Sequence, residues 1–357
     1  MHETSPAMTS KEVVRRALNR QRPPRLPVRF PGLHCDDIAW LPLTPPVTPF
    51  PANGNVDEWG CVWQATAIPN MGQVTGHPLR DAHQIDAFAA PYMDIDERFA
   101  ACHDALGTFE QHGKYVMTDI FMVLFERMHA LYGFEATLGD LLGDRPAMEA
   151  LADRILAAQI EFVQGVYRRF GTRVHGIGMT DDWGTQQAAF ISMDLWRDFF
   201  LPRYQKLFTV MHACGYDVWV HSCGKVNEII EGFLEAGVDA MNLLQPHTLG
   251  IEEIGHRYRG RLLLESAADI QVTLPTGDRA RIEEDVDALM QHWATPEGGF
   301  MACDYGDARA IGAREPRATL WMYQRFSWHS ERLYGSPLPE PVMPEIDLQP
   351  MMNEVTL

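Results

Sequence analysis

The residues best suited to metal chemistry follow two apolar runs. His221 and Cys223 come directly after a run that ends at Val220, and Cys303 follows the run 300–302. Side chains that alternate at a strand end converge when the strand turns into its loop, and a catalytic zinc takes three such ligands and keeps one open position. This spacing favours a zinc site made by His221, Cys223 and Cys303. A buried imidazole and two buried thiols are the structural alternative.

Carboxylates form a second group with chemical potential. Asp181 and Asp182 follow the apolar run 174–179, and Glu126 stands between Phe125 and Arg127. Adjacent carboxylates raise one another's pKa, which suits acid–base catalysis or the binding of polar hydrogens. All three acids are therefore candidate catalytic residues. A helix N-terminal cap with an ion pair is the alternative for the aspartates, and a surface pair with Arg127 is the alternative for Glu126.

Substrate contacts are expected from polar residues at other strand ends and from aromatic residues of the N-terminal segment. Tryptophans on an irregular, Pro-rich segment can wall an apolar pocket, although packing in the core is the more common use. Trp40 lies on the same segment. The candidates for substrate binding are Trp59, Trp63, Gln186, Gln245, His247 and Glu265.

The elements that must position these residues alternate between short apolar runs and amphipathic helices. We expect strands at 28–30, 115–121, 174–179, 217–220, 240–243, 262–264 and 300–302. We expect helices at 9–19, 97–111, 146–170, 193–214, 226–236, 251–258, 280–293 and 316–334. Such alternation predicts a parallel sheet covered by helices.

A closed barrel fits this pattern better than an open dinucleotide-binding sheet, because no GxGxxG follows the first strand. We therefore predict a (β/α)8 TIM barrel, whose active site lies at the carboxyl ends of the strands. Residues 31–80 are too long for a simple connection and are expected to cover the barrel mouth. The barrel domain is expected to span 1–335, with a Pro-rich tail at 336–357.

Composition narrows the partners. The chain has 357 residues and a net charge of −18, which disfavours nucleic acid and anionic membrane surfaces. No apolar run approaches the roughly 18–20 residues that span a bilayer, and the N-terminus lacks a hydrophobic signal core, so a cytoplasmic location is expected. The six cysteines are then free thiols or metal ligands. A homodimer is compatible with the sequence, which does not fix the oligomeric state.

Several short stretches resemble the uroporphyrinogen decarboxylase superfamily, which includes corrinoid-dependent methyltransferases. The likeness runs from about residue 9 to 330 and is strongest from 174 to 277. The matching stretches are Asp57-Glu58-Trp59-Gly60, Phe125-Glu126-Arg127, Gly133-Phe134-Glu135, Asp181-Asp182-Trp183-Gly184-Thr185-Gln186, Ile191-Ser192, Trp196, Pro202, His221-Ser222-Cys223-Gly224, Glu235-Ala236-Gly237-Val238-Asp239 and Leu274-Pro275-Thr276-Gly277. This resemblance implies the TIM barrel.

The resemblance also favours one branch of the superfamily. Porphyrinogen decarboxylases carry an Arg-rich segment after the first strand, whereas residues 30–37 here contain no Arg and two Asp. The methyltransferase branch carries a His-x-Cys pair and a distant Cys as zinc ligands. His221 and Cys223 match the pair, but the family's distant Cys falls where this chain has 305–307. The candidates for the third ligand are Cys303, Asp304, Glu265 and Glu126.

The resulting hypothesis is a zinc-dependent methyltransferase. It moves a methyl group between a small methylated substrate, such as a methoxylated aromatic, and a corrinoid (cobalamin) supplied by a partner protein. One alternative is a metal-free decarboxylase-like lyase of an aromatic or pyrrolic carboxylate, in which Asp181 or Asp182 stabilises a cationic intermediate. Another is a non-catalytic ligand-binding barrel. Metal content separates the first reading from the other two, and turnover separates the lyase from the binding protein.

Overall fold

The computed structural model describes residues 8–43, 55–66 and 72–342. A nine-stranded sheet occupies its centre, in the order β2-β1-β11-β10-β9-β8-β7-β6-β3, and every pairing in it is parallel except that of β1 with β2. Its strands are β1 (Val28–Phe30), β2 (Cys35–Asp36), β3 (Ile38–Trp40), β6 (Tyr115–Ile120), β7 (Gly176–Thr180), β8 (Asp217–His221), β9 (Ala240–Asn242), β10 (Leu263–Ser266) and β11 (Phe300–Cys303).

The two ends of this sheet meet at Asp37, between β2 and β3. Its backbone N–H donates to the carbonyl of Val28 at 2.9 Å, and its carbonyl accepts from the N–H of Tyr115 at 2.9 Å. The Asp37 carboxylate accepts from the N–H of Val28 at 2.9 Å and from both terminal nitrogens of Arg25 at 2.6 and 2.7 Å. One buried residue thus joins the first strand to the β3–β6 edge. The predicted (β/α)8 barrel is confirmed, and the segment expected to cover its mouth also supplies β3.

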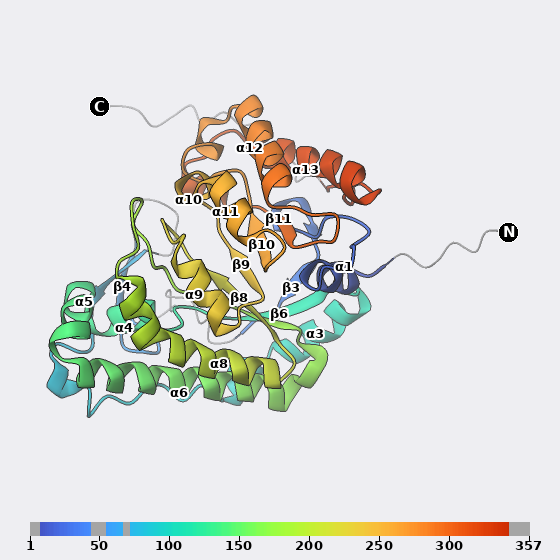
Figure 1. Ribbon diagram of the computed structural model, residues 1–357. Helices are drawn as coiled ribbons and strands as arrows, with labels where there is room; N and C mark the ends of the chain where they lie inside the picture. The colour runs from blue at the N-terminus through green and yellow to red at the C-terminus, as the bar shows by residue number, and fades with distance from the viewer. Residues whose placement is uncertain (1–7, 44–54, 67–71, 343–357) are drawn as a thin grey trace, which may run out of the picture.

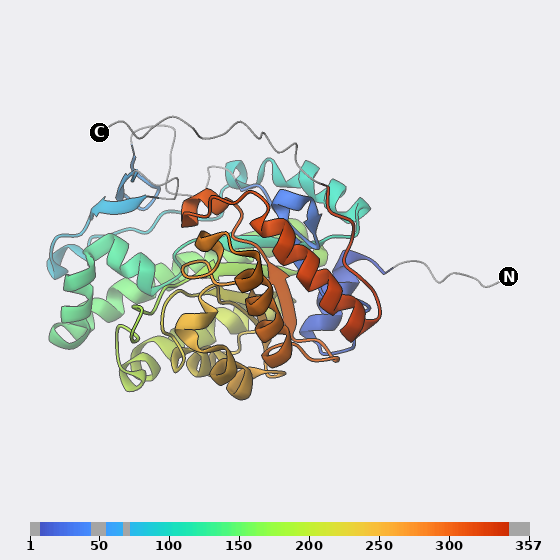
Figure 2. The same cartoon turned by 90° about the horizontal axis from the view of Figure 1, so that it is seen from above.

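Helices surround the strands, and the long helices α6 and α8 lie side by side along one flank (Figures 1 and 2). The helices of the described residues are α1 (Ser10–Leu18), α2 (Asp96–Phe99), α3 (Cys102–Gln111), α4 (Phe125–Tyr132), α5 (Phe134–Gly143), α6 (Arg145–Phe170), α7 (Met193–Leu195), α8 (Leu201–Ala213), α9 (Ile229–Ala236), α10 (Pro246–Leu249), α11 (Ile251–Tyr258), α12 (Arg279–His292) and α13 (Ala318–Tyr334). Among them, none combines the length and apolarity that a membrane crossing requires.

The first helix closes the amino end of the barrel. A cluster joins three residues of α1 to inward-facing strand residues, and its members are Val14, Ala17, Leu18, Ile38, Tyr115, Met117, Trp219, Ala240, Leu263 and Met301. Backbone bonds tie α1 down at both ends, from Lys11 N–H to Gly113 O at 2.8 Å and from Gly299 N–H to Ala17 O at 2.9 Å. A cavity inside this barrel can therefore open only at the carboxyl ends of the strands.

The second sheet is a hairpin of β4 (Val62–Gln64) and β5 (Gln73–Gly76). The residues on either side of the hairpin contact α4, which follows the carboxyl end of β6. Cys61 Sγ lies 3.2 Å from the carbonyl of Ala130, and the N–H of Leu79 donates to Leu131 O at 3.0 Å. This part of 31–80 therefore lies beside the barrel mouth. Residues 44–54 and 67–71 of this segment lie outside the described residues.

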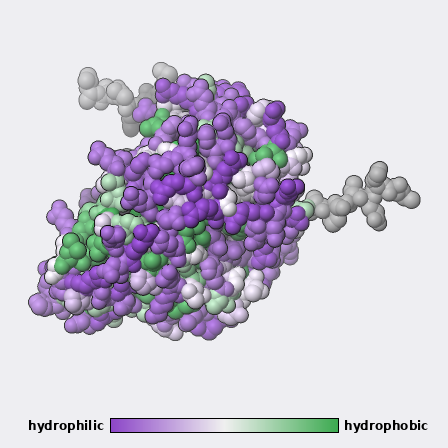
Figure 3. Space-filling view, in the orientation of Figure 1, coloured by the Kyte–Doolittle hydropathy of each residue, from purple (hydrophilic) through white to green (hydrophobic). Residues whose placement is uncertain are grey.

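The chain after α13 runs back over the start of the barrel. Tyr323 Oη donates to Pro339 O at 2.5 Å, and the N–H of Val342 donates to Leu33 O at 3.0 Å. The rest of the expected tail, from 343 on, lies outside the described residues. Figure 3 shows a mostly hydrophilic face with an apolar area over α5, where Leu142 and Phe134 are exposed.

Candidate functional site

The inward residues nearest the carboxyl ends of the eight parallel strands form a polar ring. Successive residues of a strand point to opposite faces, so the inward set alternates with the outward apolar set. The ring consists of Arg29, Trp40, Asp119, Thr180, His221, Asn242, Glu265 and Cys303, one from each strand. All of them except Cys303 line a cavity of about 350 Å³. The apolar floor beneath them includes Met117 and Trp219.

Two glycines of β7 make room for this cavity. A Cβ on Gly178 would lie 2.7 Å from the indole of Trp40, and one on Gly176 would lie 2.9 Å from Tyr115 Oη. Because β7 presents no side chain at these inward positions, the Trp40 ring extends across the barrel. Trp40 is 39% exposed and forms an aromatic wall of the cavity.

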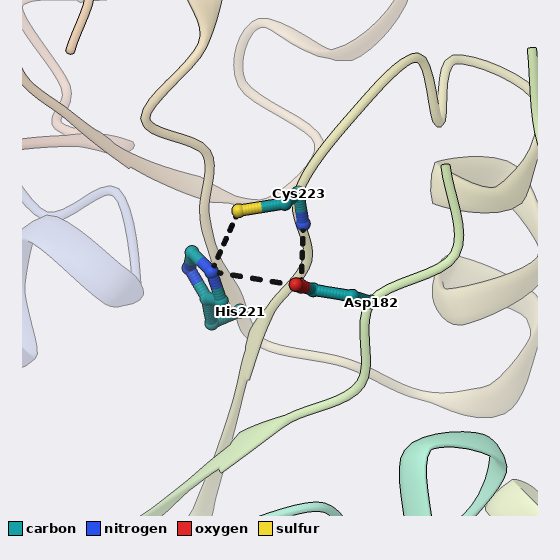
Figure 4. Close-up of side chains that lie close together, drawn as sticks. All are labelled: Asp182, His221 and Cys223. Carbon is teal, nitrogen blue, oxygen red and sulfur yellow. Dashed lines mark hydrogen bonds and ion pairs between the residues drawn. The ribbon is translucent and has the colours of Figure 1, made fainter. Parts of the chain in front are cut away.

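Asp182, His221 and Cys223 bring their ligand atoms together at the mouth (Figure 4). His221 Nε2 lies 3.2 Å from Cys223 Sγ and 3.7 Å from Asp182 Oδ1. The other ring nitrogen, Nδ1, lies 2.7 Å from Asn242 Oδ1. An amide oxygen only accepts, so Nδ1 carries the proton and the lone pair of Nε2 faces Cys223 and Asp182.

Backbone bonds hold the loop that carries Cys223. The N–H of Cys223 donates to Asp182 Oδ1, and the N–H of Gly224 donates to Gln245 Oε1, both at 2.7 Å. Gly224 has a φ of +86°, and a Cβ there would lie 2.2 Å from the carbonyl oxygen of Gly184. Only glycine fits this close approach. Gln245, predicted to bind substrate, thus supports the loop of the metal cluster.

The two adjacent aspartates have different environments. The buried carboxylate of Asp181 accepts from the N–H of Phe125 at 3.0 Å, from the N–H of Glu126 at 2.7 Å and from the hydroxyl of Tyr204. It therefore caps the start of α4, which was the structural alternative for this residue. Asp182 is the aspartate that faces His221 and Cys223.

Glu126 is a buried acid next to this cluster. Burial, followed by the charges of Asp182 and Asp181, raises its pKa well above the ordinary value. Its Oε2 atom is buried and has no hydrogen-bond partner among the described residues. The predicted alternative, a surface pair with Arg127, is wrong, because Arg127 is buried and forms its ion pair with Asp57 at 3.1 Å.

Cys303 is connected to the three clustered ligands through Asn242. Its Sγ accepts from Asn242 Nδ2 at 3.6 Å, and the same Asn242 holds His221. Among the described residues, the potential metal-binding group of three contains Asp182 and does not contain Cys303. The assignment of Cys303 as the third ligand stays a prediction. Asp182 is an alternative third ligand, because its carboxylate lies close to His221 and Cys223.

Of the six residues predicted to bind substrate, Glu265 lines the barrel cavity. Gln186 is exposed and accepts from Thr248, and His247 lies 2.7 Å from Asp285 in another surface depression. Trp63 is buried, donates to Asp57 at 3.0 Å and packs 6.1 Å from the ring of Phe121. Trp59 lies under the guanidinium of Arg127 and lines a small void behind Phe121.

Sequence reasoning missed four ring residues: Thr180, which follows the predicted strand 174–179, and Arg29, Asp119 and Asn242, which lie inside predicted strands. Arg29 Nε donates to Glu265 Oε1 at 2.6 Å. Burial raises the pKa of Asp119 to about 6. A signal was available for Arg29 and Asn242, because each lies between two apolar residues of a predicted strand. Polar groups at such positions are costly in a core and so indicate a cavity.

A family model described as Uroporphyrinogen decarboxylase (URO-D) matches residues 72–301, which is more than half of the chain. No curated protein matches. Three crystal structures show weak similarity. A D-psicose 3-epimerase in the presence of D-fructose is 11% identical, with 71% of this chain and 88% of that chain covered and a TM-score of 0.37.

The IOLI protein with a bound zinc atom is 10% identical, with 64% of this chain and 81% of that chain covered and a TM-score of 0.37. Dispersin B is 11% identical, with 81% of this chain and 86% of that chain covered and a TM-score of 0.35.

Proposed function

Because this chain belongs to the uroporphyrinogen decarboxylase family, whose enzymes are typically decarboxylases or methyltransferases, we propose that it is a zinc-dependent methyltransferase. The observation that carries this proposal is the convergence of Asp182, His221 and Cys223 beside the cavity. The reaction moves a methyl group between a small methylated substrate and a corrinoid that a partner protein supplies.

The three side chains are close enough to share a zinc ion, because their ligand atoms all lie within 4.8 Å of one another. Ligand atoms about 2.0–2.3 Å from a tetrahedral zinc lie about 3.3–3.6 Å apart. The distances from His221 Nε2 to Cys223 Sγ and Asp182 Oδ1, 3.2 and 3.7 Å, bracket that range. Asn242 on Nδ1 gives His221 the second partner that metal-binding histidines almost always have. Three protein ligands leave a fourth position for substrate.

Zinc in this position would act as a Lewis acid on the oxygen or sulfur that gains or loses the methyl group. The protein's own contribution is positioning and proton supply. Glu126, a buried acid beside the cluster whose pKa is raised by burial, is the proposed proton donor to a departing oxygen. Trp40 and Phe121 wall the cavity, and α1 seals its amino end, so substrate and partner share the open mouth.

The test is methyl-cobalt formation from reduced cobalamin, followed by absorbance, with methoxylated aromatics, methylated thiols and methylated amines as donors. We expect the His221→Ala and Cys223→Ala variants to fold and to lose the reaction. Cys214→Ala is the matched control, because that thiol lies at the end of α8 outside the cluster. Activity that survives both substitutions in the cluster contradicts the proposal.

A second candidate, a metal-free lyase, is favoured by Asp119. Its carboxyl lines the cavity and has a pKa raised to about 6, which suits proton transfer to a carbanion carbon. In this reading Asp119 replaces Asp181, whose carboxylate is occupied in capping α4. Carbon dioxide release from an aromatic or pyrrolic acid, without any methyl-cobalt formation, would establish this alternative.

A further inference from the structure

Arg29 presents an unused hydrogen-bonding edge to the cavity. Its Nε donates to Glu265 Oε1 at 2.6 Å, whereas neither terminal guanidinium nitrogen has a hydrogen-bond partner among the described residues. The side chain is 23% exposed, and it lines the barrel cavity. A partly buried cation with two unbonded terminal NH2 groups favours a ligand that brings an acceptor, because hydrogen bonds to a charged donor are stronger than neutral ones.

Glu265 occupies only one side of the guanidinium. Burial lowers the pKa of Arg29, but the acidic groups around it, Glu265 first among them, raise it by more, so the guanidinium stays charged. Glu265 accepts from Nε and leaves the two terminal NH2 groups to a second acceptor. Because a guanidinium carries five N–H donors in a planar fork, it can bind Glu265 and a ligand carboxylate at the same time.

The shape of the cavity defines the rest of the ligand. Trp40, Phe121 and Ile38 give it flat apolar walls, and a volume of about 350 Å³ suits a small molecule. His221 of the metal cluster lines the same cavity as Arg29. A ligand held at Arg29 by one end can thus reach the cluster with the other.

We propose that Arg29 determines substrate specificity by binding a carboxylate, so that the substrate is a small carboxylic acid with a flat apolar body. The two terminal NH2 groups of a guanidinium match the two oxygens of a carboxylate in a bidentate pair. Placing the methyl group at His221 rests on the proposed function, but anion binding at Arg29 does not. Glu265 positions the guanidinium by holding Nε.

The test compares equilibrium binding of benzoate and benzamide, two ligands of the same shape that differ in charge, by isothermal titration calorimetry. In the wild type we expect benzoate to bind at least about tenfold more tightly than benzamide. Arg29→Met should abolish this preference, and Arg29→Lys should keep part of it. Arg309→Met is the control, because Arg309 is exposed and pairs only with Asp307 among the described residues. It should leave the preference unchanged.

A further variant and a chelator treatment keep the test independent of folding and of the metal. Glu265→Gln removes a competing carboxylate from Arg29 and should strengthen benzoate binding even if Arg29→Met does not fold. Treating the wild type with EDTA should leave the preference unchanged, so a failed methyltransferase assay leaves this result intact. Equal binding of the two ligands by the wild type, no binding of either, or a preference that persists in Arg29→Met would overturn the proposal.

Discussion

Asn242 Oδ1 accepts from His221 Nδ1 at 2.7 Å, and the Nδ2 of the same amide donates to Cys303 Sγ at 3.6 Å. This one side chain, at the end of β9, fixes the tautomer of the histidine and separates the distant cysteine from the metal cluster. Both ends of the amide are used, the oxygen by the imidazole and the nitrogen by the thiol.

Replacing Asn242 tests its supporting role. Asn242→Ala should lower zinc affinity by about 10–100-fold, since partners on the second nitrogen of a metal-binding histidine have effects of that size. Asn242→Asp keeps an acceptor for Nδ1 and should retain more of the affinity. The measurement is zinc competition against a chromophoric chelator. An Asn242→Ala variant with wild-type affinity would show that the contact does not orient the ligand.

Asp181 should matter for stability. Asp181→Ala leaves two backbone N–H groups and the Tyr204 hydroxyl without their acceptor, so we expect a loss of roughly 2–4 kcal/mol in the free energy of unfolding. The control is Asp278→Ala at the exposed cap of α12, where about 1 kcal/mol is expected. Urea unfolding measures both. Equal, small losses would argue against a structural role and favour the predicted catalytic one.

Gly178 should control the size of the cavity. In Gly178→Ala the new methyl group collides with the Trp40 indole, which must move into the cavity or out of the barrel. We expect weaker binding of flat ligands and a shift of tryptophan fluorescence. Gly139→Ala in α5 is the matched control, because a Cβ there meets open space, and it should raise stability by about 0.5–1 kcal/mol. Unchanged ligand affinity in Gly178→Ala would place the binding site elsewhere.

Asp119 gives a pH dependence of stability. Its pKa is about 6 in the folded protein and lower in the unfolded chain. The folded protein therefore keeps this proton to a higher pH than the unfolded chain does. The free energy of unfolding falls as the pH rises from about 4 to 6. Asp119→Asn lacks this loss. We expect the variant to match the wild type near pH 4 and to exceed it at pH 7 by an amount on the order of 1–3 kcal/mol. A pH-independent difference in urea unfolding would contradict this.

Much of the barrel could be predicted because its strands are short apolar runs between amphipathic helices. The predicted strand 28–30 coincides with β1, and the run 115–121 contains β6. The strand β3 was missed because three residues in a Pro-rich and Trp-rich segment carry no visible period. The helices α4 and α5 were missed for a related reason, since α4 is buried on nearly every face and its polar residues do not mark a solvent-facing side.

The site was predicted less completely, because pairing across strands is not visible in a sequence. His221, Cys223 and Asp182 were all named, but Asp182 was assigned to catalysis and not to the metal. The predicted lack of a basic substrate-binding group concerned residues 30–37, after the first strand, whereas Arg29 lies inside that strand. The contacts that hold Trp59 and Trp63 behind Phe121 depend on Asp57 and Arg127, which lie far apart in the chain.

The most direct test of the account is the zinc content of protein purified without a histidine tag, measured by elemental analysis. We expect about one zinc per chain in the wild type, little in Asp182→Ala, His221→Ala and Cys223→Ala, and nearly full content in Cys303→Ala. Zinc lost in Cys303→Ala and kept in Asp182→Ala would restore the distant cysteine as the third ligand. A wild type without zinc after growth in zinc-replete medium would contradict the central claim.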